Sequence, residues 1–322
     1  MGGLHLAFDN GGTKSAAILF DNDFHLISFA KSGSMRSNTT SAELAAAHFN
    51  ELMSRLGLEE GATIAEVCGS YEKSLEDRLQ KRFHVENFAR SGELVLGLSA
   101  AELFGDALMA LSGTGASMYG RIGSKNISSG GYGSMVADEG SGYWISREAM
   151  IAAIRDFEGR GPRTALTDKI AYHFGGHVRE ELRAAIFSIY ADNSSPVSRV
   201  AELVPDVVDT AAEGDNVAIS ILTRAGDIIA DQMIYLIRDN TVPESVPLTV
   251  SGSVWRKNPL FFNAFIAKIR KNSPARPVII PRYEPIAGAV IERMNAKSGG
   301  RDIAPEYRET LEKEYGAFRF EI

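Results

Sequence analysis

A short apolar strand that ends in a glycine turn, and that recurs along the chain, most constrains the fold. The first copy, FDNGGTKS from Phe8 to Ser15, lies between LHLAFD and SAAILF, and FHLISFAKS follows after a DND connection. Apolar segments separated by turn residues predict three strands in a meander. ALSGTGAS (Ala110 to Ser117) and LTVSGSVW (Leu248 to Trp255) also end apolar strands. We therefore expect a mixed α/β fold with a glycine turn at three strand ends.

Much of the remaining sequence has apolar residues at helical spacing. Residues 41–57 place apolar side chains at helical spacing and end at Gly57, which predicts a helix. A buried strand (TIAEVCGS), a helix (SLEDRLQKRF) and an Ala/Leu-rich helix that starts near Glu93 follow, and the second half is rich in helices. At 322 residues the chain exceeds the size of one ordinary hydrophobic core, so we expect two domains with a cleft between them.

The first turn has the chemistry of a phosphate site. Gly11 and Gly12 let backbone N–H groups approach phosphate oxygens, Thr13 and Lys14 add donors, and Asp9 can hold Mg²⁺ through water. A plain β-hairpin explains the same residues, because Asn-Gly is a common hairpin turn. The GTG turn around Thr114 is a second candidate clamp, and it matches neither a Walker A loop nor a Rossmann fingerprint.

The segment GGYGSMVADEGSGYW, from Gly130 to Trp144, combines five glycines, two adjacent carboxylates and three aromatic residues. Paired carboxylates in a largely apolar stretch need hydrogen-bond donors, which a polyhydroxylated sugar would supply. A flexible loop with solvated acidic residues is the alternative interpretation.

Composition excludes several classes of protein. The formal net charge of −7, without a basic cluster, argues against a nucleic-acid partner. The sequence has no signal-peptide pattern and no apolar run of about 18 residues, so we expect no membrane partner and a cytoplasmic location. The single cysteine, Cys68, excludes an intrachain disulfide and a multi-cysteine metal site, and its apolar flanks indicate burial.

Taken in order, these segments resemble the N-acetylglucosamine kinase family, within the BadF/BadG/BcrA/BcrD-type ATPase group of the actin/hexokinase superfamily. The most specific part is GGYGSMVADEGSGYW, followed by REAM and GRGPRTALTD. The resemblance implies an actin-like ATPase fold with two ribonuclease-H-like domains, mixed five-stranded sheets and an interdomain cleft. We place the domains at residues 1–115 and 116–322, and the last helix is a candidate to pack back on the N-terminal domain.

The resemblance also implies site residues, with ATP and Mg²⁺ as cofactors and a small-molecule sugar as partner. Asp9 would position Mg²⁺. The residues expected to hold phosphates are Gly11, Gly12, Thr13, Lys14, Thr114 and Gly115. Gly252 and Ser253 would lie under the adenosine. The residues expected to contact the sugar are Asn38, Gly131, Tyr132, Asp138 and Glu139.

Two positions depart from the family pattern. The family has an aspartate at the start of the helix before the GTG strand, where it accepts the proton of the attacking sugar hydroxyl. This sequence reads RSGELV there, so Glu93 is the expected base, and Ser91 at that position is the alternative, which would cripple catalysis. The first turn also reads DNGG instead of DGGG, and Asn10 can adopt the left-handed conformation such a turn requires.

The sequence therefore predicts ATP-dependent phosphorylation of an amino sugar or N-acetylamino sugar, with N-acetylglucosamine at the 6-hydroxyl as first choice. One alternative is a catalytically weak sugar- or nucleotide-binding protein. Another is an activator ATPase of a CoA-ester reductase or dehydratase, which would need several cysteine ligands for its cluster. A homodimer remains open.

Overall fold

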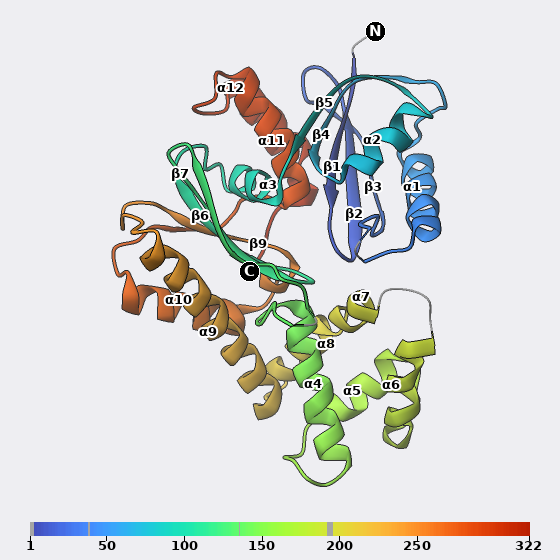
Figure 1. Cartoon of the computed structure of the whole chain (residues 1–322), viewed down its shortest axis with the longest axis vertical. Coiled ribbons are helices and arrows are strands. Elements are labelled where there is room, and N and C mark those ends of the chain that lie inside the picture. Colours follow the sequence, from blue (N-terminus) through green and yellow to red (C-terminus); the bar gives the residue numbers. More distant parts are fainter. Residues whose placement is uncertain (1–2, 38, 135, 192–195) are drawn as a thin grey trace.

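Two five-stranded sheets with the same strand order organise the protein (Figure 1). The computed structural model describes residues 3–37, 39–134, 136–191 and 196–322. The first sheet has the order β3-β2-β1-β4-β5 and consists of β1 (Leu4–Asn10), β2 (Lys14–Phe20), β3 (Leu26–Gly33), β4 (Thr63–Ser70) and β5 (His84–Ser91). Strands β1 to β3 form an antiparallel meander, and β4 and β5 continue the sheet in parallel with β1.

The second sheet repeats this plan. Its order is β10-β9-β6-β7-β8, and its strands are β6 (Ala107–Ser112), β7 (Ala116–Ile122), β8 (Lys125–Gly130), β9 (Leu248–Ser251) and β10 (Val278–Ile279). Strands β6 to β8 form the meander, and β9 and β10 run parallel to β6. Because β6 corresponds to β1 and β9 to β4, the two glycine turns occupy equivalent positions in the two sheets.

Alternation along β1 and β2 gives the first sheet a separate core on each face. One face carries Leu6 and Phe8 and packs against α1 (Ala42–Leu56) and α2 (Lys73–Gln80). Ser41 caps the N-terminus of α1, and Gly57 ends the helix in the left-handed conformation. The opposite face carries Ala7 and Cys68 and packs against α11 (Pro285–Lys297) and α12 (Pro305–Glu314).

Most helices of the second half share one core with Leu108 and Ala110, the largest core of the described residues, and α9 (Asn216–Asp239) packs directly on this face of the sheet. These helices are α4 (Gly142–Phe157), α5 (Leu166–His173), α6 (Leu182–Ala191), α7 (Pro196–Ala201), α8 (Val204–Ala212), α9 (Asn216–Asp239) and α10 (Pro259–Asn272). Short 3₁₀ helices lie at Arg179–Glu181, Ser253–Trp255 and Gly316–Phe318. On the other face, Met109 packs against α3 (Glu93–Ala100).

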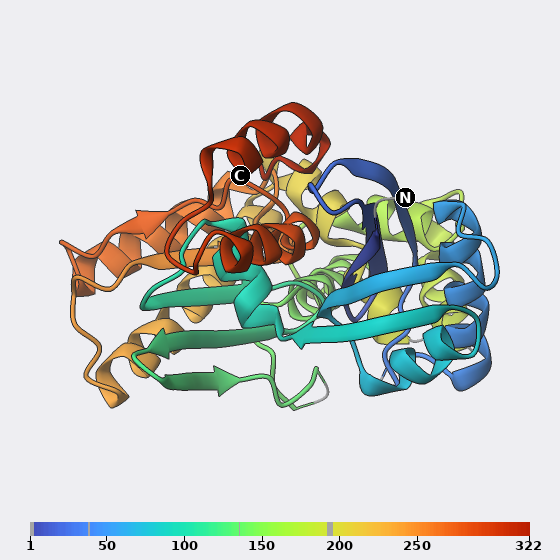
Figure 2. The same ribbon diagram turned by 90° about the horizontal axis from the view of Figure 1, so that it is seen from above.

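The chain crosses between the halves through α3 and α11, which pack against each other between the two sheets (Figures 1 and 2). Their contact requires Gly288, because a Cβ there would lie 2.1 Å from the Leu96 carbonyl oxygen. Helix α3 follows β5 and α11 follows β10, so the two crossing helices also occupy equivalent positions in the repeated plan.

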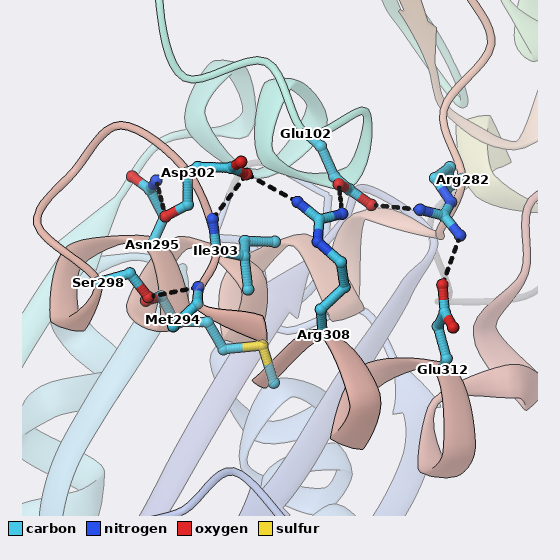
Figure 3. A network of polar contacts seen from close by, with 10 residues as sticks. Glu102, Arg282, Met294, Asn295, Ser298, Asp302, Ile303, Arg308 and Glu312 are labelled. Carbon is cyan, nitrogen blue, oxygen red and sulfur yellow. Dashed lines mark hydrogen bonds and ion pairs between the residues drawn. The ribbon is translucent and has the colours of Figure 1, made fainter. Parts of the chain in front are cut away.

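A polar network holds α12 against these crossing segments (Figure 3). Glu102, just after α3, forms ion pairs with Arg282 at 3.1 Å and with Arg308 of α12 at 2.5 Å. Arg282 also pairs with Glu312 at 3.1 Å. Beyond α12, the Glu284 N–H donates to the Phe318 carbonyl at 2.7 Å, and Phe320 packs in the core of the second half. The C-terminal segment therefore contacts both halves.

The mixed α/β fold with two five-stranded sheets is confirmed, as are the opening meander and the helix over 41–57. The sequence pattern did not locate the strands β5, β7 and β8 or the helices α10 and α12. The division at residues 115 and 116 stays a prediction, and the second sheet already begins at Ala107. In the described part of the chain, no helix combines the length and apolar character that crossing a membrane requires.

Candidate functional site

The first glycine turn joins β1 to β2 and is held mainly by side chains. The Gly11 N–H donates to the Lys14 carbonyl at 2.9 Å, which closes the hairpin. Asn10 is buried, and its side-chain oxygen accepts the Ser15 hydroxyl at 2.7 Å and the Met35 N–H at 3.2 Å. The Ser34 hydroxyl donates to the Gly11 carbonyl at 2.8 Å. The segment after β3 therefore supports this turn.

The second turn joins β6 to β7 and is held mainly by backbone. Gly113 N–H donates to the Gly115 carbonyl at 2.9 Å. The first N–H groups of α4 close over the turn: Gly142 donates to the Gly113 carbonyl at 2.7 Å and Tyr143 to the Thr114 carbonyl at 3.3 Å. These bonds anchor the turn to a helix of the same half.

The two turns meet. The hydroxyls of Thr13 and Thr114 lie 2.5 Å apart, a hydrogen bond between residues 101 positions apart in the sequence. The Ser198 hydroxyl of α7 donates to the Gly12 carbonyl at 3.0 Å, which adds a second contact across the halves. Two glycine turns that face each other with hydroxyls and free backbone donors form a site suited to a polyphosphate.

Carboxylates surround the first turn at the carboxyl ends of the parallel strands. Asp9 is the next-to-last residue of β1, Glu93 is the first residue of α3, and Glu284 is the residue directly before α11. Burial raises the pKa of Asp9 to about 6, with Glu93 and Glu284 adding to the rise and Arg36 and Lys31 opposing it. Glu93 and Glu284 are thus close enough to Asp9 for their charges to act on it.

Glu93 is held by a guanidinium group. Arg36, in the segment after β3, pairs with the Glu93 carboxylate and donates through Nε to the Asn10 carbonyl at 2.6 Å. The Tyr119 ring of β7 packs beside α3, and burial, followed by the Glu93 charge, raises the pKa of its hydroxyl. Sequence reasoning placed Glu93 here but missed Arg36 and Tyr119.

The glycine-rich loop before α4 places its two acidic residues in different environments. Asp138 is buried in a left-handed conformation (φ 59°), and a Cβ at Gly115 would lie 2.6 Å from its Oδ2. Burial raises the pKa of Asp138, while the N–H groups of Gly133 and Ala116 oppose the rise. Its Oδ1 has no hydrogen-bond partner among the described residues. Glu139, by contrast, is exposed.

The other predicted sugar contacts lie at the outer part of this loop. Gly131 (φ 75°) packs on Ser117, where a Cβ would lie 2.5 Å from the Ser117 hydroxyl. The Tyr132 side chain is 80% exposed. Asn38 lies outside the described residues.

The predicted adenosine turn packs directly behind the second phosphate turn. Gly252 has φ 106°, and a Cβ there would lie 2.2 Å from the Ser112 carbonyl oxygen, so only glycine fits. Ser253 begins the 3₁₀ helix that follows.

The structure thus brings one set of predicted residues together around the two turns: Asp9, Gly11, Gly12, Thr13, Lys14, Glu93, Thr114, Gly115, Asp138 and Gly252. It does not bring Tyr132 or the Glu139 side chain into contact with that set. A hollow of about 860 Å³ between α9 and α10 lies away from this cluster, and none of the predicted residues lines it. Of the two residues that the sequence analysis missed, only Arg36 had a visible signal. It is an isolated cation among small residues in SGSMRSN.

Comparison with known proteins agrees with this geometry. The model of the BadF/BadG/BcrA/BcrD ATPase family matches residues 8–292. The chain is 22% identical to the N-acetyl-D-glucosamine kinase of Dictyostelium discoideum, over 91% of this chain and 98% of that one. It is 25% identical to the N-acetylmuramic acid/N-acetylglucosamine kinase of Clostridium acetobutylicum, over 89% and 96%.

A solved structure of a candidate N-acetylglucosamine kinase from Porphyromonas gingivalis superposes with a TM-score of 0.67 at 16% identity, covering 91% of this chain and 99% of that one. This likeness confirms the fold expected from the sequence. With a family match that spans most of its length and two facing glycine turns on repeated sheets, the chain belongs to the BadF/BadG/BcrA/BcrD ATPase family.

Proposed function

We propose that this protein transfers the γ-phosphoryl group of ATP to a hydroxyl of an amino sugar, with the 6-hydroxyl of N-acetylglucosamine as the first choice. The meeting of the two turns at Thr13 and Thr114, with Glu93 beside them, carries the proposal. The names of both curated relatives support an N-acetylated amino sugar as substrate.

In this proposal the two turns divide the phosphate chain between them. The N–H groups and hydroxyls at Gly11 to Lys14 bind from one half, and Thr114 and Gly115 bind from the other. Because the Thr13 and Thr114 hydroxyls satisfy each other at 2.5 Å, phosphate oxygens would replace that bond as they enter. Gly252 and Ser253 would lie under the adenosine, and Asn38, Gly131, Tyr132, Asp138 and Glu139 stay predicted sugar contacts.

The acidic residues fit a magnesium ion that arrives with the nucleotide. No cluster of three or more ligating side chains occurs in the described part of the chain. Mg²⁺ bound with nucleotide usually keeps several waters and takes one or two carboxylates. Asp9 and the unpartnered Oδ1 of Asp138 are the groups that would hold such an ion. The ion would supply neutralisation of phosphate charge.

Glu93 is the proposed base that accepts the proton of the sugar hydroxyl. Phosphoryl transfer depends mainly on positioning and charge stabilisation, so a carboxylate held in place by the Arg36 guanidinium suits this role.

A coupled assay of ADP release tests the proposal with glucosamine, N-acetylglucosamine, N-acetylmuramic acid and glucose. We expect ADP release that depends on an N-acetylated amino sugar. Release that is independent of sugar, or absent with all four, would contradict the proposed function.

Replacing the base separates chemistry from binding. We expect Glu93→Gln to lower turnover by about 100-fold or more while calorimetry still detects sugar binding. Asp231→Asn is a matched control, because Asp231 pairs with Lys268 at 2.5 Å on the distant α9–α10 face and should leave turnover unchanged. Turnover by Glu93→Gln equal to that of the unaltered protein would refute Glu93 as base.

One observation favours a second candidate, a protein that binds sugar or nucleotide with little catalysis. Arg36 already pairs with the Glu93 carboxylate, so this carboxylate has a partner before any sugar hydroxyl arrives. Calorimetric binding of sugar without ADP release would select this function. The activator-ATPase alternative lacks support because Cys68, the single cysteine of the chain, is buried. A homodimer and a cytoplasmic location stay predictions.

A further inference from the structure

Arg36 connects the two positions at which the sequence departs from the family pattern. Asn10 replaces a glycine of the first turn, and Glu93 replaces the aspartate expected as base. Arg36 Nε donates to the Asn10 carbonyl at 2.6 Å, and its Nη2 pairs with the Glu93 carboxylate. The guanidinium thus spans from the phosphate turn to the proposed base.

The Asn10 side chain sets the position of the segment that carries Arg36. Its oxygen accepts the N–H of Met35, the residue before Arg36, and it also accepts the Ser15 hydroxyl of β2. The Arg36 N–H donates to the Ser34 hydroxyl at 3.2 Å, and the Arg36 carbonyl accepts the Thr40 N–H at 3.0 Å. A glycine at position 10 would keep the turn carbonyl but lose both side-chain bonds.

The length of Glu93 matters for the same contact. Glu93 is the first residue of α3, and Gly92 before it provides no side chain to hold the helix end. An aspartate at position 93 would withdraw the carboxylate by about 1.5 Å, one carbon–carbon bond, and so lose the close pair with Arg36. The length of the Glu93 side chain therefore suits the distance to the Arg36 guanidinium.

The surroundings make the guanidinium necessary. Glu93 and Glu284 place two further carboxylates near Asp9, so negative charge is concentrated beside the first turn. Glu284 is paired with Arg256 at 2.8 Å and lies 3.9 Å from Lys31. Arg36 is the cation that contacts both the turn and Glu93 among the described residues.

We propose that Arg36 is a positioning residue that holds Glu93 at a fixed distance from the first phosphate turn, so that Asn10, Arg36 and Glu93 act as one unit. This inference rests on the proposed function, because it assigns Arg36 a role through the proposed base. A planar fork with several donors can hold two groups at once, which a lysine ammonium does less well.

The test measures kcat and KM for sugar-dependent ADP release in four variants: Arg36→Met, Arg36→Lys, Glu93→Asp and the Arg36→Met/Glu93→Asp double variant. We expect Arg36→Met to lower kcat by about 10- to 100-fold with a change in sugar KM below about 3-fold. Arg36→Lys should restore part of kcat. The double variant should be no slower than the slower single variant, because residues acting as a unit are not additive.

Arg55→Met is the matched control, because Arg55 forms an exposed ion pair with Glu51 at 2.7 Å on α1, away from the site. Thermal unfolding of each variant shows whether it remains folded. An unchanged kcat in a folded Arg36→Met protein contradicts the proposal. So does a raised sugar KM at constant kcat, which would make Arg36 a sugar contact, or a fully additive double variant.

The same assays distinguish failure of the proposed kinase function from failure of the proposed role of Arg36. If the unaltered protein releases no ADP with any of the four sugars, the proposed function fails and the role of Arg36 fails with it. If the unaltered protein is active and Glu93→Gln is inactive, but Arg36→Met is as fast as the unaltered protein, only the role of Arg36 is refuted.

Discussion

The two glycine turns occupy equivalent places in the repeated sheets but are stabilised by different means. The first turn depends on side chains: Ser34 and Arg36 donate to its carbonyls, and the Asn10 side chain accepts from the Ser15 hydroxyl and the Met35 N–H. The second depends on close backbone packing against Gly252 and the start of α4. A turn held by side chains can change by graded substitution, whereas a turn held by glycine contacts tolerates little change.

Gly252→Ala is the strongest test of this difference between the two turns. The new Cβ would meet the Ser112 carbonyl at 2.2 Å, and φ 106° is a conformation that only glycine adopts readily. We expect a loss of about 3 kcal/mol or more in stability, or failure to fold. Urea unfolding measures it, with Gly105→Ala as control because a Cβ there meets nothing within 4 Å. Equal stability of the two variants would contradict the contrast.

A comparison of one glycine from each turn sharpens this difference. At Gly115 a Cβ would lie 2.6 Å from Asp138 Oδ2, whereas at Gly12 its nearest neighbour would be Thr114 Cβ at 3.5 Å. We expect Gly115→Ala to cost about 1–2 kcal/mol and Gly12→Ala less than about 1 kcal/mol. Thermal unfolding checks both values, and the reverse order would show that the first turn is the tighter one.

Asn10→Ala tests the side-chain support of the first turn. The substitution leaves the Ser15 hydroxyl and the Met35 N–H without their shared acceptor in a buried place. We expect a loss of about 1 kcal/mol in stability together with a fall in kcat of about 10-fold. Urea unfolding and the ADP-release assay measure the two effects. Unchanged kcat would mean that the turn holds its shape without this side chain.

The smallest effect concerns how the first half holds α12. His25 Nδ1 lies 2.8 Å from Glu314 Oε1, and this hydrogen bond, with the Glu314 charge, raises the pKa of His25. The folded pKa exceeds the unfolded one, so the stabilisation is full below about pH 6.5 and disappears as pH rises through the folded pKa.

We therefore expect the unaltered protein to lose about 1 °C more in melting temperature than His25→Gln between about pH 6 and about pH 9. Differential scanning calorimetry at the two pH values checks this difference. Parallel pH profiles of the two proteins would show that the pair contributes nothing.

Local pattern was sufficient to predict the elements whose own residues specify them. Ser41 and Gly57 mark the ends of α1, and the apolar segments of β1 and β2, separated by turn residues, indicate a meander. Strand β5 escaped prediction because HVENFARS shows no clear alternation and its parallel pairing with β4 comes from distant sequence. Helix α12 is polar, and it is held by partners such as Glu102 that no local pattern reveals.

Site residues could be predicted where the residue type itself implies a chemical role. Contacts and burial that depend on the folded arrangement could not. The glycines and Asp9 follow from motifs, but the contact between Thr13 and Thr114 needs the two sheets to face each other. The adjacent acids Asp138 and Glu139 look alike in sequence, yet a left-handed backbone at Asp138 buries one and leaves the other exposed. Arg36 gained its importance only through Glu93, 57 positions away.

The burial of Cys68 allows an experiment that measures whether the two halves move relative to each other. Its side chain is inaccessible beneath α11, and burial raises the pKa of the thiol, so alkylating dyes should leave it unmodified in the folded state. As the chain has no other cysteine, a pair of introduced surface cysteines could carry a fluorescent donor and acceptor without removing any native residue. Energy transfer between them would then report, in the native background, whether nucleotide and sugar draw the two sheets together.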